Sequence, residues 1–233
     1  MIQVVKVKDR DKGQVKAHGL LLDLVDKDTL LALSGGTSVD YRSMIVKPPL
    51  RQGFEGQADD IIPGAICIVD ERYGEPFHKD SNEKLLLDQG VKRFADDKCI
   101  ETHKVLKGAN LEETAKLYDL EIRDLFARFK KKVGVMGVGT NLHTAGIFPA
   151  SYMAHSPGYV VWDEVEDKYP ERISLTLKAL GEFTDFIIMI FGREKKEALK
   201  IMLDEKEHDM QKYPAIFYRK SRIKTWLITD IEI

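Results

Sequence analysis

The chain has 233 residues, of which 43% are hydrophobic and 32% are charged, a balance typical of a soluble protein with a sizeable core. The formal net charge of -2 gives no indication of nucleic-acid binding or of attachment to an anionic membrane surface. No signal peptide and no apolar run of about 18 residues is visible, so we expect a cytoplasmic protein without a membrane span. Cys67 and Cys99 lack the spacing of a metal site, and we expect neither a metal nor a disulfide framework.

The N-terminal part predicts helices that alternate with buried strands. Apolar positions between Val15 and Val25 indicate a short helix, interrupted near Gly19. Pro48 and Pro49 end a later helix ahead of a polar loop at 50–63. The remaining predicted elements are strands at 29–33, 64–69 and 100–106, and one helix that starts near Ser81 and buries residues up to Phe94.

The C-terminal part continues this alternation. Asn110 caps a long amphipathic helix that reaches Phe129, and the basic run 130–132 after it is interpreted as a solvated helix end, because no interleaved aromatics accompany it. Aromatic residues in the irregular segment 150–170 either pack over a pocket or cover the core. Further strands are predicted at 133–136, 172–177, 185–191 and 225–228, and a helix at 195–203. The pattern predicts an α/β fold with a mostly parallel sheet, as one domain over residues 1–233.

A glycine turn follows the first predicted buried strand. We expect Thr37 or Ser38 to cap a helix that continues toward Ile45. Strand, glycine turn and capped helix together form the layout of an anion site, because free N–H groups and the positive helix end point at the loop. Such a turn equally satisfies backbone geometry alone. Its residues are Ser34, Gly35, Gly36, Thr37 and Ser38.

Polar residues also follow two other buried strands. Asp70, Glu71 and Arg72 come directly after the strand at 64–69, and His143 lies in the loop that opens at Gly137. Ligands of α/β proteins bind at the carboxyl ends of such strands, and a histidine there exchanges protons near neutral pH. The alternative interpretations are a solvated turn for the charged triplet and a histidine that only packs its loop.

These loops resemble the motifs of 6-phosphogluconolactonases, in the order in which that family has them. The parent group also contains glucosamine-6-phosphate deaminases. The resemblance implies a Rossmann-like three-layer α/β/α fold, shared with ribose-5-phosphate isomerase and CoA transferases. It also implies a phosphosugar substrate, with no required metal or cofactor. The matching segments are 33–38, Asp70-Glu71-Arg72 with Asp80-Ser81-Asn82, His143-Thr144-Ala145 with Phe148-Pro149, Arg172–Leu177, and Gly192 with Lys195.

The chain departs from the family pattern at the loop histidine. Asn141 and Leu142 stand where the family has Asp-Gly, and the lost carboxylate removes a charge that raises a histidine pKa or orients its ring. Deaminases place a glutamate five residues after this histidine, where the chain has Phe148, and a tyrosine where it has Arg72. Both differences favour the lactonase branch, whereas Gly74 and Pro76 resemble the deaminase loop.

The resemblance implies hydrolysis of 6-phospho-D-glucono-1,5-lactone to 6-phosphogluconate, a step of the pentose phosphate pathway. We expect His143 to act as general base on water and then to protonate the leaving ring oxygen. Arg72 either stabilises developing negative charge or forms a structural salt bridge; Asp70 orients Arg72, His143 or a sugar hydroxyl, and Asn141 preserves geometry by hydrogen bonding. The expected substrate- and phosphate-binding residues are Ser34, Gly35, Gly36, Thr37, Ser38, Arg172 and Lys195.

Two other functions remain open. One is a phosphosugar isomerase or deaminase with altered machinery. The other is a non-catalytic sugar-phosphate sensor, which the change at Asn141 and Leu142 favours. We expect a small-molecule partner and neither nucleic acid nor membrane; the sequence leaves the oligomeric state open.

Overall fold

The computed structural model describes residues 2–36, 38–47 and 60–232. Its strands are β1 (Ile2–Lys6), β2 (Thr29–Leu33), β3 (Ala65–Ile68), β4 (Asp70–Arg72), β5 (Glu101–His103), β6 (Lys131–Gly137), β7 (Val160–Glu164), β8 (Glu171–Leu175), β9 (Asp185–Ile190) and β10 (Lys224–Thr229). Its α-helices are α1 (Arg10–Leu24), α2 (Asn82–Asp88), α3 (Val91–Asp97), α4 (Leu111–Arg128), α5 (Leu177–Leu180), α6 (Lys196–Leu203) and α7 (Phe217–Lys220). Shorter helical turns are η1 (Arg42–Val46), η2 (Tyr152–Ala154), η3 (Arg193–Lys195) and η4 (Pro214–Ile216).

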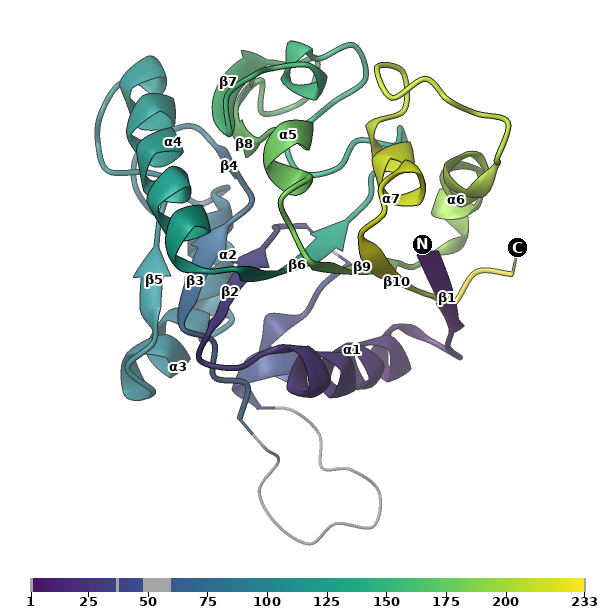
Figure 1. Cartoon of the computed structure of the whole chain (residues 1–233), viewed down its shortest axis with the longest axis horizontal. Coiled ribbons are helices and arrows are strands. Elements are labelled where there is room, and N and C mark those ends of the chain that lie inside the picture. The colour runs from purple at the N-terminus through teal and green to yellow at the C-terminus, as the bar shows by residue number, and fades with distance from the viewer. Residues whose placement is uncertain (1, 37, 48–59, 233) are drawn as a thin grey trace, which may run out of the picture.

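Seven parallel strands form the central sheet, in the order β1-β10-β9-β6-β2-β3-β5. Helix α1 covers one face, and α4, α5 and α7 lie on the other (Figure 1). A second, antiparallel sheet of three strands, β4-β8-β7, lies on the side of α5. The predicted three-layer α/β fold with a mostly parallel sheet is confirmed.

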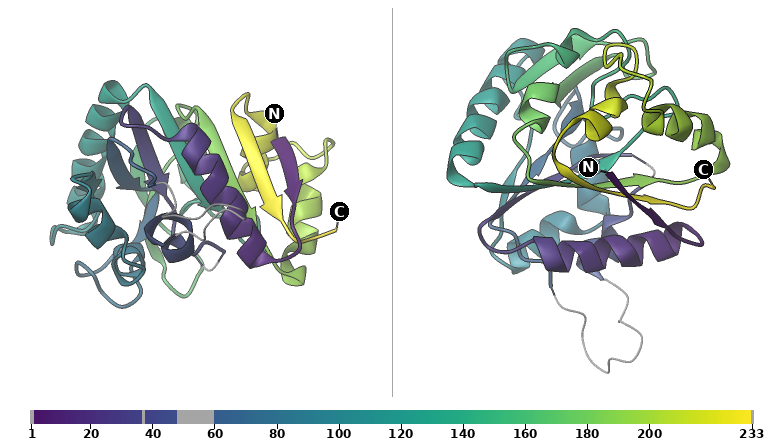
Figure 2. Two further views of the ribbon diagram at one scale, coloured as in Figure 1. Left: turned by 90° about the horizontal axis from the view of Figure 1, so that it is seen from below. Right: turned by 45° about the vertical axis from the view of Figure 1, so that its right-hand side comes forward.

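The strand order reverses direction between β2 and β6. From β2 the chain moves outward through β3 to β5, then returns to β6 on the other side of β2 and continues to β9 and β10. The loops after β2 and β6 therefore diverge, and this topological switch point is where open α/β sheets leave a crevice for a ligand. The first and last strands pair at the far edge, where β1 lies beside β10 (Figure 2).

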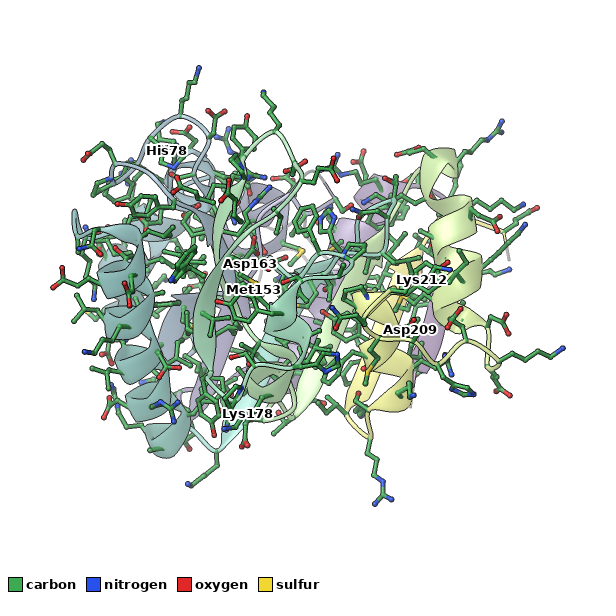
Figure 3. All side chains as sticks on the ribbon, turned by 90° about the horizontal axis from the view of Figure 1, so that it is seen from above. His78, Met153, Asp163, Lys178, Asp209 and Lys212 are labelled. Carbon is green, nitrogen blue, oxygen red and sulfur yellow. The ribbon has the colours of Figure 1, made fainter. Side chains whose placement is uncertain are left out.

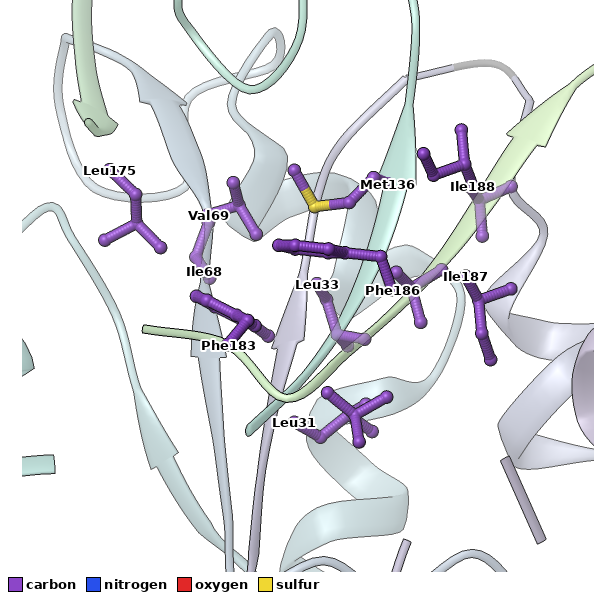
Figure 4. Close-up of a cluster of buried hydrophobic side chains, with 14 of the residues drawn as sticks. Leu31, Leu33, Ile68, Val69, Met136, Leu175, Phe183, Phe186, Ile187 and Ile188 are labelled. Carbon is purple, nitrogen blue, oxygen red and sulfur yellow. The ribbon is translucent and has the colours of Figure 1, made fainter. Parts of the chain in front are cut away.

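The core lies between the sheet and its covering helices. Phe186 of β9 is fully buried, with Met136 on one side and Leu33 on the other (Figure 4). Its ring also stacks on Phe183 at a centroid distance of 5.1 Å. A Cβ atom on Gly134 of β6 would lie 2.7 Å from this ring, so the glycine leaves the space that Phe186 fills.

Two predicted helix starts are confirmed. The Asn110 side chain accepts a hydrogen bond from the N–H of Glu113 at 2.9 Å, and Ser81 accepts one from the N–H of Lys84 at 3.0 Å. Both satisfy N–H groups that the first helical turn leaves without a partner.

The N-terminal prediction needs two corrections. Helix α1 runs unbroken through Gly19, whose Cβ position faces open space, because a single glycine costs a helix only about 1 kcal/mol. Strand β1 precedes it and was not predicted, since it is an edge strand whose side chains are mostly exposed.

The expected helix after the glycine turn is wrong. The chain instead forms η1, a short π-helix that begins at Arg42, and Asp40 rather than Ser38 accepts hydrogen bonds from the N–H groups of its first turn, at 3.1 Å from Arg42 and 3.4 Å from Ser43. Ser38 therefore caps no helix, and Thr37, Pro48 and Pro49 lie outside the described residues. Of the predicted loop at 50–63, only residues 60–63 are described.

Three further segments differ from the prediction. The single helix expected from Ser81 to Phe94 is split into α2 and α3 at Gly90, whose φ of +85° is left-handed. Asp70–Arg72 forms strand β4 rather than a turn, and the supposedly irregular segment 150–170 contains β7. Figure 3, seen from above, shows Met153 and Asp163 between α4 and the segment that carries Asp209 and Lys212.

We predict that Phe186→Ala lowers the free energy of unfolding by about 3–5 kcal/mol, because it empties a fully buried site between sheet and helices. Urea denaturation followed by circular dichroism measures the loss. Leu120→Ala is the control, since Leu120 is 57% exposed and its truncation is expected to cost less than about 0.5 kcal/mol. Equal losses in the two variants would contradict the assignment of Phe186 to the core.

Candidate active site

A cavity of about 300 Å³ lies at the carboxyl ends of the central strands. The segments that line it follow β2, β3, β6 and β9, which places the cavity at the topological switch point, and β8 adds one residue from the small sheet. The lining residues are Ser34, Gly35, Gly36, Ser38, Asp70, Arg72, Asn82, Gly137, Val138, Gly139, His143, Ala145, Phe148, Asp167, Arg172 and Lys195.

The structure brings nearly all the sequence-predicted site residues to this cavity. Asn141 lies behind it rather than in its wall, in contact with His143. Thr37 is outside the described residues. The predicted residues Ser34, Gly35, Gly36, Ser38, Asp70, Arg72, His143, Arg172 and Lys195 all line the cavity.

The glycine turn forms one wall of the cavity. A Cβ atom on Gly35 would lie 1.9 Å from Oδ1 of Asn82, so only glycine fits there, and Gly36 has a left-handed φ of +104°. Among the described residues, the N–H groups of Gly35 and Gly36 and the buried hydroxyl of Ser34 have no hydrogen-bond partner. These free N–H and O–H groups are donors whose hydrogen bonds an anion can accept, and no helix N-terminus in the described part of the chain adds to them.

His143 is held in one tautomer by Asn141. The side-chain oxygen of Asn141 accepts hydrogen bonds from the backbone N–H of His143 at 3.1 Å and from its Nδ1 at 2.7 Å. A carbonyl oxygen only accepts, so the proton of the neutral ring lies on Nδ1 and the lone pair on Nε2. Asn141 thus supplies the orientation that a carboxylate supplies elsewhere in the family pattern.

The surroundings of His143 keep its ring neutral. Burial, followed by the charges of Arg172, Lys195 and Arg72, lowers its pKa to about 4, and only Asp167 opposes the shift. The ring stacks on Phe148 with a centroid distance of 4.4 Å and an angle of 10° between the planes. The imidazole is therefore a free base at neutral pH.

Close packing and hydrogen bonds fix the loop that carries His143. A Cβ atom on Gly139 would lie 2.2 Å from the imidazole, which requires glycine at that position. The hydroxyl of Thr144 donates to the carbonyl of Gly137 at 3.3 Å and lies 2.6 Å from the hydroxyl of buried Tyr218, which then donates to it. The ring position thus depends on contacts with α7.

Three cationic side chains converge on the cavity. Arg172 is 5% exposed, its Nε donates to the carbonyl of Tyr169 at 2.8 Å, and its Nη2 pairs with Asp167. Arg72 donates from Nη1 to the carbonyl of Asp80 at 2.7 Å, and its buried Nε has no partner among the described residues. These contacts leave several guanidinium N–H groups available to a ligand.

The third cation is Lys195, which follows β9 at the end of η3. Its Nζ donates to the hydroxyl of Ser38 at 2.9 Å, and burial lowers its pKa. The electropositive wall of the cavity, which Arg72, Arg172 and Lys195 form, thus has the charge that a phosphate group requires.

Two acidic residues from β4 have different roles. Burial raises the pKa of Asp70, while Arg172, Arg72 and the amide of Asn82 oppose that rise. Glu71 points away from the cavity and accepts hydrogen bonds from the N–H groups of Asn82 at 2.6 Å and Glu83 at 2.9 Å. Glu71 therefore caps helix α2, and of the two residues only Asp70 lines the cavity.

Sequence reasoning did not assign Asn82 or Asp167 to the site. Asn82 donates to the backbone carbonyl of Asp70 at 2.6 Å, and its Oδ1 is buried without a partner among the described residues. The sequence signal for Asn82 was its place in the segment Asp80-Ser81-Asn82, which resembles a family motif. Asp167 had no such signal, because its role depends on a contact with Arg172 made by strand pairing.

Two kinds of feature are absent from the described ranges. No cluster of three or more His, Cys, Asp or Glu side chains there could hold a metal ion. None of the helices in the described part of the chain is both long enough and apolar enough to span a membrane.

A parallel sheet with a basic cavity at its switch point defines a Rossmann-like α/β protein with an anion-type site. The model of the glucosamine-6-phosphate isomerase/6-phosphogluconolactonase family matches residues 24–227. The chain therefore belongs to this family.

Two relatives are similar over most of their length. A probable 6-phosphogluconolactonase 1 from Arabidopsis thaliana is 24% identical over 84% of this chain and 82% of the relative. A 6-phosphogluconolactonase from Nostoc sp. is 24% identical over 94% of this chain and 92% of the relative.

Solved structures confirm the fold but do not separate the branches of the family. A 6-phosphogluconolactonase from Plasmodium vivax has a TM-score of 0.78 at 18% identity, covering 98% of this chain and 89% of that chain. A monomeric glucosamine-6-phosphate deaminase has a TM-score of 0.77 at 15% identity, covering 98% and 96%. The residues of the site must therefore distinguish the lactonase branch from the deaminase branch.

We predict that Asn141→Asp raises the pKa of His143 from about 4 toward its usual value, because a carboxylate on Nδ1 stabilises the imidazolium. Titration of the ring by NMR measures the shift. Asn110→Asp makes the same chemical change at a helix cap and is expected to leave the titration of His143 unchanged. An unshifted pKa in Asn141→Asp would mean that residue 141 does not contact the ring in solution.

Proposed function

We propose that the protein is a 6-phosphogluconolactonase that hydrolyses 6-phospho-D-glucono-1,5-lactone to 6-phosphogluconate. The observation that carries the proposal is the stack of Phe148 on His143. Phe148 occupies the position at which the deaminase pattern has a titratable glutamate, so within this loop the neutral imidazole of His143 is the one proton carrier. Lactone hydrolysis needs no second one, whereas ring opening and isomerisation do.

The phosphate of the substrate is assigned to the electropositive wall. Arg172 and Lys195 supply charge, and the N–H groups of Gly35 and Gly36 with the hydroxyls of Ser34 and Ser38 supply further donors. A dianion among these groups also offsets the positive field that lowers the pKa of His143, so substrate binding makes the imidazole a stronger base.

Catalysis begins when Nε2 of His143 takes a proton from water as the water oxygen attacks the carbonyl carbon of the lactone. Arg72 stabilises the negative charge that develops on the carbonyl oxygen, and Asp70 with Asn82 orients a sugar hydroxyl. The tetrahedral intermediate then collapses, the ring C–O bond breaks, and the imidazolium returns its proton to the leaving oxygen. The imidazole is thereby restored for the next turnover.

Gly74, one of the two residues that resemble the deaminase loop, has a local structural explanation. A Cβ atom on Gly74 would lie 2.9 Å from the ring of His78, whose Nε2 contacts the carbonyl of Arg72 at 2.9 Å. Gly74 is therefore explained by local packing against His78, and it says nothing about the reaction.

The first test is hydrolysis of freshly generated lactone, corrected for spontaneous hydrolysis. We expect His143→Ala to lower kcat about 10²–10⁴-fold, the usual contribution of a general base. His155→Ala is the matched control, because His155 is exposed and outside the cavity. A His143→Ala enzyme that keeps its rate within a few-fold would refute the proposed base.

Lys195→Ala tests phosphate binding separately. We expect KM to rise about 10- to 100-fold with a smaller change in kcat, because a charge-assisted contact to a non-reacting group is lost. Lys196→Ala removes an equal charge from the neighbouring, exposed position and is expected to leave KM nearly unchanged. A KM that is unaffected by Lys195→Ala would remove this residue from the site.

A further inference from the structure

The segment 165–170, between β7 and β8, places a carboxylate in the cavity that otherwise gathers positive charge. Asp167 lines the cavity, and its side chain remains 37% exposed while it pairs with Nη2 of Arg172. The guanidinium of Arg172 itself is only 6% exposed in the same pair. An acidic group thus occupies one of the donors assigned to the phosphate.

Asp167 is ionised at neutral pH. Burial alone would raise its pKa, but the N–H group of Lys168 and the guanidinium of Arg172 bring the pKa below its usual value. A phosphate dianion that reaches Arg172 therefore meets a negative charge already bound there. The phosphate and the carboxylate of Asp167 then either both bind the guanidinium, despite their mutual repulsion, or the phosphate displaces the carboxylate from it.

Asp167 is not required to orient Arg172. Nε of Arg172 donates to the carbonyl of Tyr169 at 2.8 Å, and the guanidinium carbon lies 5.3 Å from the ring centre of Phe148 and 5.9 Å from that of Tyr169. Tyr169 is in turn fixed by its hydroxyl, which donates to Asp80 at 2.7 Å. The position of the guanidinium is thus set by contacts that survive the loss of the carboxylate.

We propose that Asp167 is an internal competitor of the substrate phosphate, which holds Arg172 in the free protein and weakens the affinity of the site for phosphorylated ligands. The carboxylate leaves Arg172 when phosphate binds. The inference rests on the assignment of Arg172 to phosphate binding in the proposed function. A site with such a competitor releases a phosphorylated product more readily than one with three uncompensated cations.

Equilibrium binding tests this role without relying on turnover. The probes are inorganic phosphate and 6-phosphogluconate, titrated near neutral pH by isothermal calorimetry into the wild-type chain and into Asp167→Asn. We expect Asp167→Asn to bind both about two- to fivefold more tightly, the range that corresponds to a partly exposed ion pair. Glu166→Gln removes the same charge from the adjacent exposed residue and is expected to bind as the wild type does.

Asp167→Glu supplies the conservative control, since it keeps a carboxylate beside Arg172 and should keep the weaker, wild-type affinity. Unchanged or weaker binding by Asp167→Asn would overturn the inference and make Asp167 a residue that positions Arg172. If none of the proteins binds phosphate, both the phosphate assignment and the inference fail. Intact phosphate binding without lactone hydrolysis refutes the proposed reaction alone.

Discussion

The convergence of Arg72, Arg172 and Lys195 on one cavity is the constraint on which the site depends. Like charges at close range repel one another, and burial makes that repulsion stronger than in water. The fold offsets it locally, with Asp167 on Arg172, the hydroxyl of Ser38 on Lys195 and buried Asp70 between the arginines. The positive potential suits the cavity to an anion, and together with burial, which is the larger cause, it lowers the pKa of His143.

Much of this arrangement was predictable from local sequence. Continuous apolar runs identify β2, β3, β6 and β9, and polar residues directly after buried parallel strands must meet at one edge of the sheet. The glycine turn, Asp70, Arg72 and His143 were found in this way, whereas Lys195 was assigned through the resemblance of its segment to a family motif. Their common location follows from topology alone, because the order of the strands decides which ends become neighbours.

What was missed depends on long-range pairing. Strand β4 is three residues long and exists because it pairs with β8, with Asp70 opposite Ser174 and Arg72 opposite Arg172. No periodicity over three residues distinguishes such a strand from a charged turn. The pairing of β8 with β7 brings Asp167 to Arg172, and the hydrogen bond from Asn82 brings α2 to Asp70. The helix expected after Ser38 begins only at Arg42, because Asp40 caps its first turn while the hydroxyl of Ser38 is bonded to Lys195.

The departure from the family pattern at Asn141 and Leu142 has a coherent physical account. Leu142 adopts a left-handed φ of 65°, which costs a residue with a Cβ atom about 1–2 kcal/mol. Its side chain is 98% buried, since only 2% is exposed, and its carbonyl accepts the N–H of Ala215 at 3.0 Å, so packing compensates for the strain that glycine would avoid. Asn141 keeps the hydrogen bond to the ring without the negative charge of an aspartate. The two substitutions together keep the ring of His143 hydrogen-bonded without placing a carboxylate on Nδ1, so under the proposed function the charge of a bound phosphate joins that of Asp167 in raising the pKa of the ring.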